Sequence, residues 1–118
     1  MVEKENSSTD LTDNLLQELR RGALVMAVLS QLKEEQYGYS LKQRLGERGL
    51  EVNEGTLYPL MRRLENQGLL QSHWEVVDDA RPRRYYQISP EGENILTTLI
   101  TEWQSLTEVI EALVVSNH

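Results

Sequence analysis

The sequence contains no cysteine in its 118 residues, which excludes disulfide frameworks, thiolate metal sites and cysteine nucleophiles. It also has no apolar run near the roughly 18–20 residues that a membrane span requires. The first ten residues are polar and acidic, unlike a secretory signal. His73 and His118 have no neighbours at metal-ligand spacing, so we expect neither a metal site nor a cofactor. These absences predict a cytoplasmic protein, and the length suits a single domain.

Catalytic motifs are also missing. The sequence contains no glycine-rich phosphate loop and no serine in a nucleophile elbow. Its apolar fraction of 39% and charged fraction of 26% are ordinary for a globular protein. We therefore expect a non-enzymatic protein whose function is to bind a partner.

Basic residues are scarce, with 12 Lys and Arg against 19 Asp and Glu, for a net charge of −7. Taken as a whole, this balance disfavours a nucleic-acid partner. The charge is unevenly distributed, however. Residues 1–19 hold one base and five acids, and residues 91–118 hold five acids and no base. Residues 20–90 hold eleven bases and nine acids, so a mildly basic middle lies between two acidic ends.

Apolar residues recur at helical spacing near the N-terminus, at Leu15, Leu19, Gly22, Met26 and Leu29. A second apolar stripe lies beside the first, so this segment has two surfaces to bury. We expect a helix over 11–34, preceded by a disordered acidic tail over 1–10.

A short helix is expected next. Leu41 and Leu45 lie one helical turn apart, and Gly49 is a natural stop, which predicts a helix over 38–47. The polar positions between these leucines would face away from the buried stripe. The helix would therefore carry basic side chains on its exposed side.

A third helix is indicated by the apolar face of Leu57, Leu60, Met61 and Leu64. Asn53 is a good N-cap and Gly68 a good residue after the C-terminus. Pro59 would remove a backbone hydrogen bond beyond the first turn. We therefore expect an irregular first turn, or a helix that begins nearer residue 57.

The period then changes to that of a strand, with Leu70, Trp74 and Val76 on one side. A turn-like stretch of Asp78, Asp79, Ala80 and Pro82 precedes Tyr85, Tyr86 and Ile88, which favour a second strand. These features predict a hairpin whose tip carries Arg81, Arg83 and Arg84.

The last segment is predicted to be a helix over 90–115, because Ser89-Pro90-Glu91 is a strong start signal. Its apolar residues follow a heptad pattern over about three heptads. The helix is too long for the rest of one chain to cover this seam, so a second copy is expected to pack against it. The predicted dimer interface consists of Leu15, Leu19, Leu96, Leu99, Trp103, Leu106, Ile110 and Leu113.

The predicted order is a long helix, two short helices, a basic-tipped hairpin and a long helix. In a winged helix-turn-helix, the second short helix enters the DNA major groove and the hairpin, or wing, meets the backbone or minor groove. A three-helix bundle with a hairpin that serves no function is the alternative. The fold class expected is mainly α with a small β-hairpin: a winged helix over 11–89 and a dimerisation helix over 90–115.

Three strings are specific: YGYSLKQRL (37–45), EGTLYPLMRRLENQGLL (54–70) and ARPRRYYQISPEG (80–92). They resemble the PadR family of bacterial transcriptional regulators, and the resemblance covers about residues 15–113. The single C-terminal helix is similar to the compact subgroup of that family. Ala80 departs from the glycine common there, which puts the wing turn in doubt. The resemblance implies a winged-helix homodimer that represses transcription at an inverted-repeat operator, often in response to a small molecule.

The predicted contacts with double-stranded DNA are Tyr39, Lys42, Gln43, Thr56, Tyr58, Arg62, Arg63, Arg81, Arg83 and Arg84. Hydroxyls and guanidinium groups suit phosphates and base edges. Structural alternatives exist for several of them. Tyr58 could pack on the second helix, Arg63 could pair with Glu47 or Glu65, and Arg84 could pair with Glu75 or Asp78.

Trp103 is large for a coiled-coil position, and two copies near a twofold axis could leave a slot. In some PadR relatives, a tryptophan at the matching place lines an aromatic ligand site between subunits. A tentative effector site therefore comprises Trp103, Leu99, Met26 and Leu19. The alternative for Trp103 is simple dimer packing.

A different class of function also fits the pattern. The acidic C-terminal helix could hold another protein, with the winged helix as a scaffold that does not bind DNA sequence-specifically. A heterodimer could use the same seam. Size measurement of the pure protein would distinguish a homodimer from a monomer.

Overall fold

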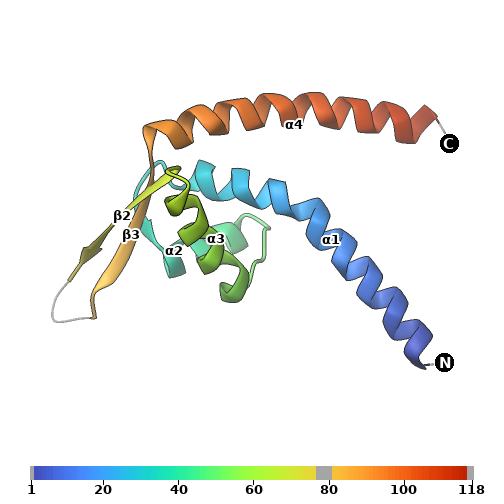
Figure 1. The fold of residues 1–118 in the computed structure, drawn as a ribbon, viewed down its shortest axis with the longest axis horizontal. Helices are drawn as coiled ribbons and strands as arrows, with labels where there is room; N and C mark the ends of the chain where they lie inside the picture. The colour runs from blue at the N-terminus through green and yellow to red at the C-terminus, as the bar shows by residue number, and fades with distance from the viewer. Residues whose placement is uncertain (1, 77–80, 117–118) are drawn as a thin grey trace.

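The computed structural model describes residues 2–76 and 81–116. It is mostly helical with one small antiparallel sheet, which confirms the expected fold class (Figure 1). The elements, in chain order, are α1 (Val2–Gln31), β1 (Gln36–Tyr37), α2 (Gly38–Glu47), α3 (Glu54–Asn66), β2 (Leu70–Glu75), β3 (Arg83–Ile88) and α4 (Pro90–Ser116).

Helix α1 begins earlier than predicted. The sequence predicted a disordered tail over 1–10 and a helix over 11–34, but α1 starts at Val2 and ends at Gln31. Between Val2 and Arg21 there is neither glycine nor proline, so nothing in the sequence interrupts the helical backbone. The polar composition that suggested disorder is equally compatible with an exposed helix.

Helix α3 begins at Glu54, with Asn53 as its N-cap. The Asn53 side chain accepts a hydrogen bond from the backbone N–H of Thr56 at 2.8 Å, as the sequence predicted. Pro59 lies inside the helix without preventing this start. The carbonyl that loses its partner belongs to Gly55, which is exposed and can bond to water instead.

The sheet has three strands in the order β1-β3-β2, all antiparallel. The hairpin of β2 and β3 confirms the prediction, and its predicted turn at Asp78, Asp79 and Ala80 lies outside the described residues. Strand β1 was not predicted, because two residues are too short to show a period. It pairs Gln36 with Tyr86 and Tyr37 with Tyr85, and so attaches the start of α2 to the hairpin.

The hydrophobic core joins all four helices and the hairpin. Each leucine buried there contributes about 1.5–3 kcal/mol to folding. The buried residues are Leu24, Val28, Leu29, Leu32, Leu41, Leu45, Leu57, Leu60, Met61, Leu64, Leu70, Tyr86, Ile88 and Leu96.

The first turn of α4 is tightly attached to this core. The Ser89 hydroxyl donates to the Gly68 carbonyl at 2.6 Å and accepts from the Gly92 N–H at 2.9 Å. A Cβ atom at Gly92 would lie only 2.2 Å from the Leu69 carbonyl oxygen.

The structure corrects the prediction for Leu96. This residue was predicted in the dimer interface, but it is only 4% exposed within its own chain.

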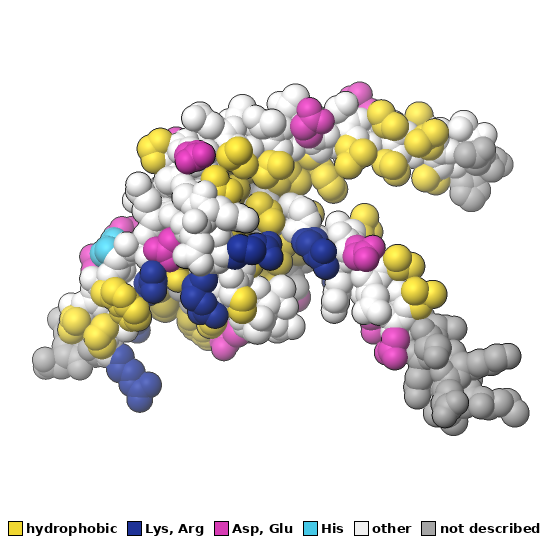
Figure 2. All heavy atoms as spheres, viewed as in Figure 1, with side chains coloured by type: hydrophobic (Ala, Val, Ile, Leu, Met, Phe, Trp, Pro, Cys, Tyr) yellow, Lys and Arg dark blue, Asp and Glu magenta, His cyan; other side chains and the backbone are white. Residues whose placement is uncertain are grey.

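Beyond this attachment, α1 and α4 diverge (Figure 1). Yellow apolar side chains line the side of α4 that faces α1, and others lie on the outer half of α1 (Figure 2). The predicted interface residues exposed in this single chain are Leu15, Leu19, Trp103, Leu106, Ile110 and Leu113. Leu99 is partly buried against the core. Among the described helices, none is long and apolar enough to cross a membrane.

Candidate nucleic-acid interface

The start of α2, the middle of α3 and the hairpin meet around a groove of about 370 Å³. Strand β1 positions this arrangement because it attaches α2 to β3. The groove is rich in aromatic and arginine side chains. It is lined by Tyr37, Gly38, Tyr39, Tyr58, Met61, Arg62, Trp74, Arg83, Arg84 and Tyr86.

Five of the ten predicted DNA contacts line this one groove. They come from three separate elements of the chain: α2, α3 and β3. These residues are Tyr39, Tyr58, Arg62, Arg83 and Arg84. Folding therefore gathers onto one surface side chains that are far apart in the sequence.

Tyr58 packs against the start of α2, as the structural alternative for this residue proposed. Its ring occupies the space above Gly38, where a Cβ would lie 2.7 Å from the Tyr58 Cε1 atom. Burial of the ring raises the pKa of the Tyr58 hydroxyl, and Glu54 and then Tyr39 raise it further. The hydroxyl is therefore a neutral donor at physiological pH, suited to a phosphate oxygen.

Arg83 remains exposed while its guanidinium lies 4.5 Å from the centre of the Tyr37 ring. This cation–π contact restricts the long side chain and leaves its N–H donors accessible. Tyr37 is itself held edge-on against Tyr85, with ring centres 5.7 Å apart. The basic side chain of the wing is therefore supported by an aromatic layer.

Arg84 is held by partners within its own chain. Its terminal nitrogen lies 2.9 Å from the Glu65 carboxylate, and its Nε donates to the Ser72 hydroxyl at 2.9 Å. Ser72 in turn donates to Glu65. The ion-pair partner is thus Glu65 rather than the Glu75 considered from sequence. The network ties the hairpin to α3 and neutralises the charge of Arg84.

Two other predicted contacts line a second groove, of about 580 Å³. Thr56 and Arg63 lie there on the outer side of α3, facing Arg20 and Arg21 from α1. This grouping places Thr56 and three arginines around one groove beside α3. Glu65, one of the two acids considered as a partner for Arg63, is paired with Arg84 instead.

The remaining predicted contacts lie around the grooves. Gln43 is exposed on α2 and donates to the Tyr39 hydroxyl at 3.2 Å, which orients that ring. Lys42 is half-buried on the same helix, and Arg81 is exposed just before β3. These three residues therefore border the surface without lining either groove.

Sequence reasoning missed two kinds of residue at this surface. Trp74 was assigned to the apolar side of a strand, yet it is 63% exposed and has Arg84 5.6 Å from its ring centre. Arg20 and Arg21 were counted among the bases of residues 20–90 but were not assigned to the site. Their adjacency in an otherwise acidic segment was the available signal. Lys and Arg side chains form a band across this face (Figure 2).

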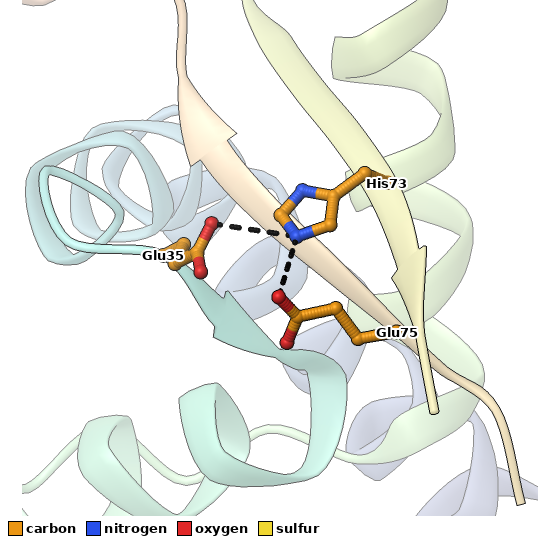
Figure 3. Close-up of side chains that lie close together, drawn as sticks. All are labelled: Glu35, His73 and Glu75. Atoms are coloured by element: carbon orange, nitrogen blue, oxygen red, sulfur yellow. Dashed lines mark ion pairs between the residues drawn. The ribbon is translucent and has the colours of Figure 1, made fainter. Parts of the chain in front are cut away.

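A separate cluster of side chains surrounds His73, for which the sequence showed no neighbours at metal-ligand spacing. The carboxylates of Glu35 and Glu75 both approach its imidazole (Figure 3). Glu35 is far from His73 in the sequence, so the spacing of residues could not indicate that the two are neighbours. Strand β1, which was not predicted, brings it to the sheet.

A model of the transcriptional regulator PadR-like family matches residues 25–98. This segment spans α2, α3 and the hairpin, together with the adjoining parts of α1 and α4. The chain belongs to the PadR-like family. A curated relative, the transcriptional regulator Rv3488 of Mycobacterium tuberculosis, is 41% identical over 83 residues, which cover 70% of this chain and 77% of the relative.

Solved structures of PadR regulators share this fold. A PadR family regulator from Eggerthella lenta is 44% identical with a TM-score of 0.82, covering 92% of this chain and 96% of that chain. A PadR-like transcription factor from Bacteroides fragilis is 37% identical with a TM-score of 0.73, covering 85% and 98% respectively. The winged-helix arrangement of this PadR-like transcriptional regulator is therefore that of its family.

Proposed function

We propose that this PadR-like regulator binds a specific inverted-repeat operator as a homodimer and represses transcription there. The observation that carries the proposal is the groove in which Tyr39, Tyr58, Arg62 and Arg83 converge from three elements. Exposed guanidinium groups on two adjacent elements suit a polyanion. Helix α3, like any α-helix about 10–12 Å across with its side chains, fits a major groove about 12 Å wide.

Both sides of α3 would then contribute to the DNA interface. Arg62 and Tyr58 face the hairpin side, where the wing supplies Arg83. Thr56 and Arg63 face α1, where Arg20 and Arg21 add charge. In this arrangement phosphate contacts lie on both flanks of α3, and base contacts come from the helix between them.

The homodimer is supported by apolar surface that one chain leaves exposed. The gap between α1 and α4 has apolar side chains on both sides (Figure 2). A second copy with the same two helices would bury both surfaces at once, as twofold symmetry requires. Two recognition helices would then read half-sites about 10 base pairs apart, or a multiple of that distance.

The effector site remains a proposal at Trp103. This side chain is 45% exposed in the single chain, whereas Met26 and Leu99 are partly buried against the core. Leu19 is exposed on α1. A planar aromatic compound between two Trp103 rings would change the affinity of the dimer for DNA only if it bound one spacing of the wings more tightly than another.

Selection of bound sites from random duplex DNA tests the main proposal. We expect an inverted repeat with the stated half-site spacing, bound by a dimer. Recovery of no enriched sequence, with binding that depends on charge alone, would instead support the scaffold function considered from sequence. Repeating the selection with small molecules from a cell extract tests for an effector.

The two tryptophans allow a separate test of the effector site. In a Trp74→Phe variant, Trp103 is the only tryptophan, so its fluorescence reports on α4 alone. We expect quenching by planar aromatic compounds in this variant and no quenching in Trp103→Phe. If a broad set of such compounds leaves Trp103 fluorescence unchanged, the residue serves only in packing.

A further inference from the structure

Three side chains with metal-ligating atoms converge on the outer surface of the sheet. Glu35 comes from the segment before β1, and His73 and Glu75 come from β2 (Figure 3). One ligand atom from each residue lies within 4.8 Å of the others. His73 and Glu75 alternate with Trp74 along β2, so they share a face of the strand.

The distances within the cluster are informative. His73 Nε2 lies 3.3 Å from Glu75 Oε1 and 3.6 Å from Glu35 Oε2. A charge-assisted N–H···O bond is shorter, about 2.7–2.9 Å, and one N–H cannot direct itself at two carboxylates equally. By contrast, ligands about 2.0–2.1 Å from a tetrahedral ion are about 3.3–3.4 Å apart. The two separations from Nε2 match shared coordination better than hydrogen bonding, and the two carboxylate oxygens lie within 4.8 Å of each other.

The imidazole is held in position by its neighbours. The His73 ring stacks on Tyr85, with ring centres 5.9 Å apart and planes inclined by 17°. Tyr85 is the direct strand partner of His73 on one side and of Tyr37 on the other. This aromatic layer reduces the freedom that His73 would lose on binding an ion, which favours binding.

The geometry points to a binding site for one divalent transition-metal ion, of which Zn²⁺ is the representative. His73 Nε2 and one oxygen each from Glu35 and Glu75 are three protein ligands, and water would complete the tetrahedron. The two carboxylates balance the charge of the ion. Imidazole with few oxygen ligands disfavours Ca²⁺ and Mg²⁺, which prefer six or more oxygens.

NMR of the full-length protein tests this site, since the chain has only two histidines. Metal-free protein is titrated with Zn²⁺ alone, and the imidazole signals of His73 and His118 are followed. We expect saturable one-to-one changes at His73 Nε2. Glu35→Gln and Glu75→Gln should each weaken Zn²⁺ binding by about tenfold or more, since even the loss of a group that only orients a ligand costs 10–100-fold.

Glu34→Gln is the matched control, because Glu34 is also exposed, adjacent to Glu35 and outside the cluster. It should leave the Zn²⁺ affinity within twofold of the unmodified protein. Three results would overturn the site: unchanged His73 signals in excess Zn²⁺, changes confined to His118, or equal affinities of Glu34→Gln and Glu35→Gln. None of these measurements depends on DNA binding.

Discussion

Arg83 and Arg84 are consecutive on β3, yet their guanidinium groups lie in different surroundings. Arg83 rests on the Tyr37 ring and keeps its donors accessible. Arg84 is paired with Glu65 and Ser72, so its charge is already balanced. The consequence is that Arg83 has charge available for a phosphate, while Arg84 holds the wing in place.

Removal of the charge at Arg62 or Arg83 should weaken DNA binding. For Arg62→Ala or Arg83→Ala, we expect weaker binding to the selected operator and a salt-dependence slope reduced by about one unit per lost phosphate contact. Binding measured across a series of salt concentrations gives both quantities.

Lys33→Ala is the control for these variants, because Lys33 is exposed and basic but lines neither groove. It should bind operator with the affinity and slope of the unmodified protein. The assigned surface is wrong if Arg62→Ala and Arg83→Ala match this control at every salt concentration.

The sequence could identify which residue types carry charge, but it could not distinguish these two arginines. Both follow Pro82 in a basic string, and their environments depend on partners from other elements. Glu65 lies on α3 and Tyr37 on β1, so neither contact has a local signature. For the same reason, the sequence did not show that Glu35 lies near His73, and Trp74 was assigned to an apolar face.

Among the elements, α3 and the hairpin are joined by the Glu65–Ser72–Arg84 network. Glu65→Gln would keep the shape of the side chain but remove the charge that pairs with Arg84. We expect the free energy of unfolding to fall by about 1 kcal/mol, because the network is partly exposed to water. Denaturant unfolding measures this change, and a value equal to that of the unmodified protein would contradict it.

The docking of α4 depends on the absence of a side chain at Gly92. Gly92→Ala would place a Cβ 2.2 Å from the Leu69 carbonyl oxygen, a backbone atom that cannot move aside easily. We expect a loss of about 1–3 kcal/mol or more in stability. Thermal unfolding is a sufficient measurement.

Gly46→Ala provides the comparison for this substitution. Its Cβ would meet only the flexible end of Glu51, at 3.3 Å, and alanine favours a helix over glycine by about 1 kcal/mol. Stability should therefore stay level or rise. If Gly92→Ala unfolds at the same temperature as Gly46→Ala, the close approach has no energetic significance.

Elements with a strong period or clear caps were predictable from sequence. Helices α2 and α4 have nearly the predicted bounds, since leucine spacing and terminal glycine or proline define them. The start of α1 was not predictable, because polar residues fit both a tail and an exposed helix. Strand β1 was not predictable, because its pairing with β3 is purely tertiary.

At the scale of the whole molecule, the net charge of −7 does not exclude a DNA partner. The described part of α4 carries five glutamates and no basic residue, whereas arginines border both grooves. A dimer would carry twice −7, or −14. We therefore expect weak non-specific DNA binding that decreases steeply with salt.

The homodimer can be tested on α4 directly. Leu106→Glu introduces a charge into the exposed apolar face between α1 and α4, and burying that charge on association would be costly. We expect a shift from dimer to monomer in light scattering. Thr101→Glu, on the opposite side of α4, should remain dimeric, and a fully dimeric Leu106→Glu would contradict the proposed interface.

The attachment of α4 through its first turn has a mechanical consequence. At about 1.5 Å per residue, α4 is about 40 Å long, and only its first part is held against the core, where Gly92 meets Leu69 and Leu96 is buried. A rotation of about five degrees there moves the far end by about 3.5 Å, close to the rise of one base pair. In the proposed dimer, a rotation of a few degrees at this attachment would therefore change the distance between the two recognition helices by about one base-pair step.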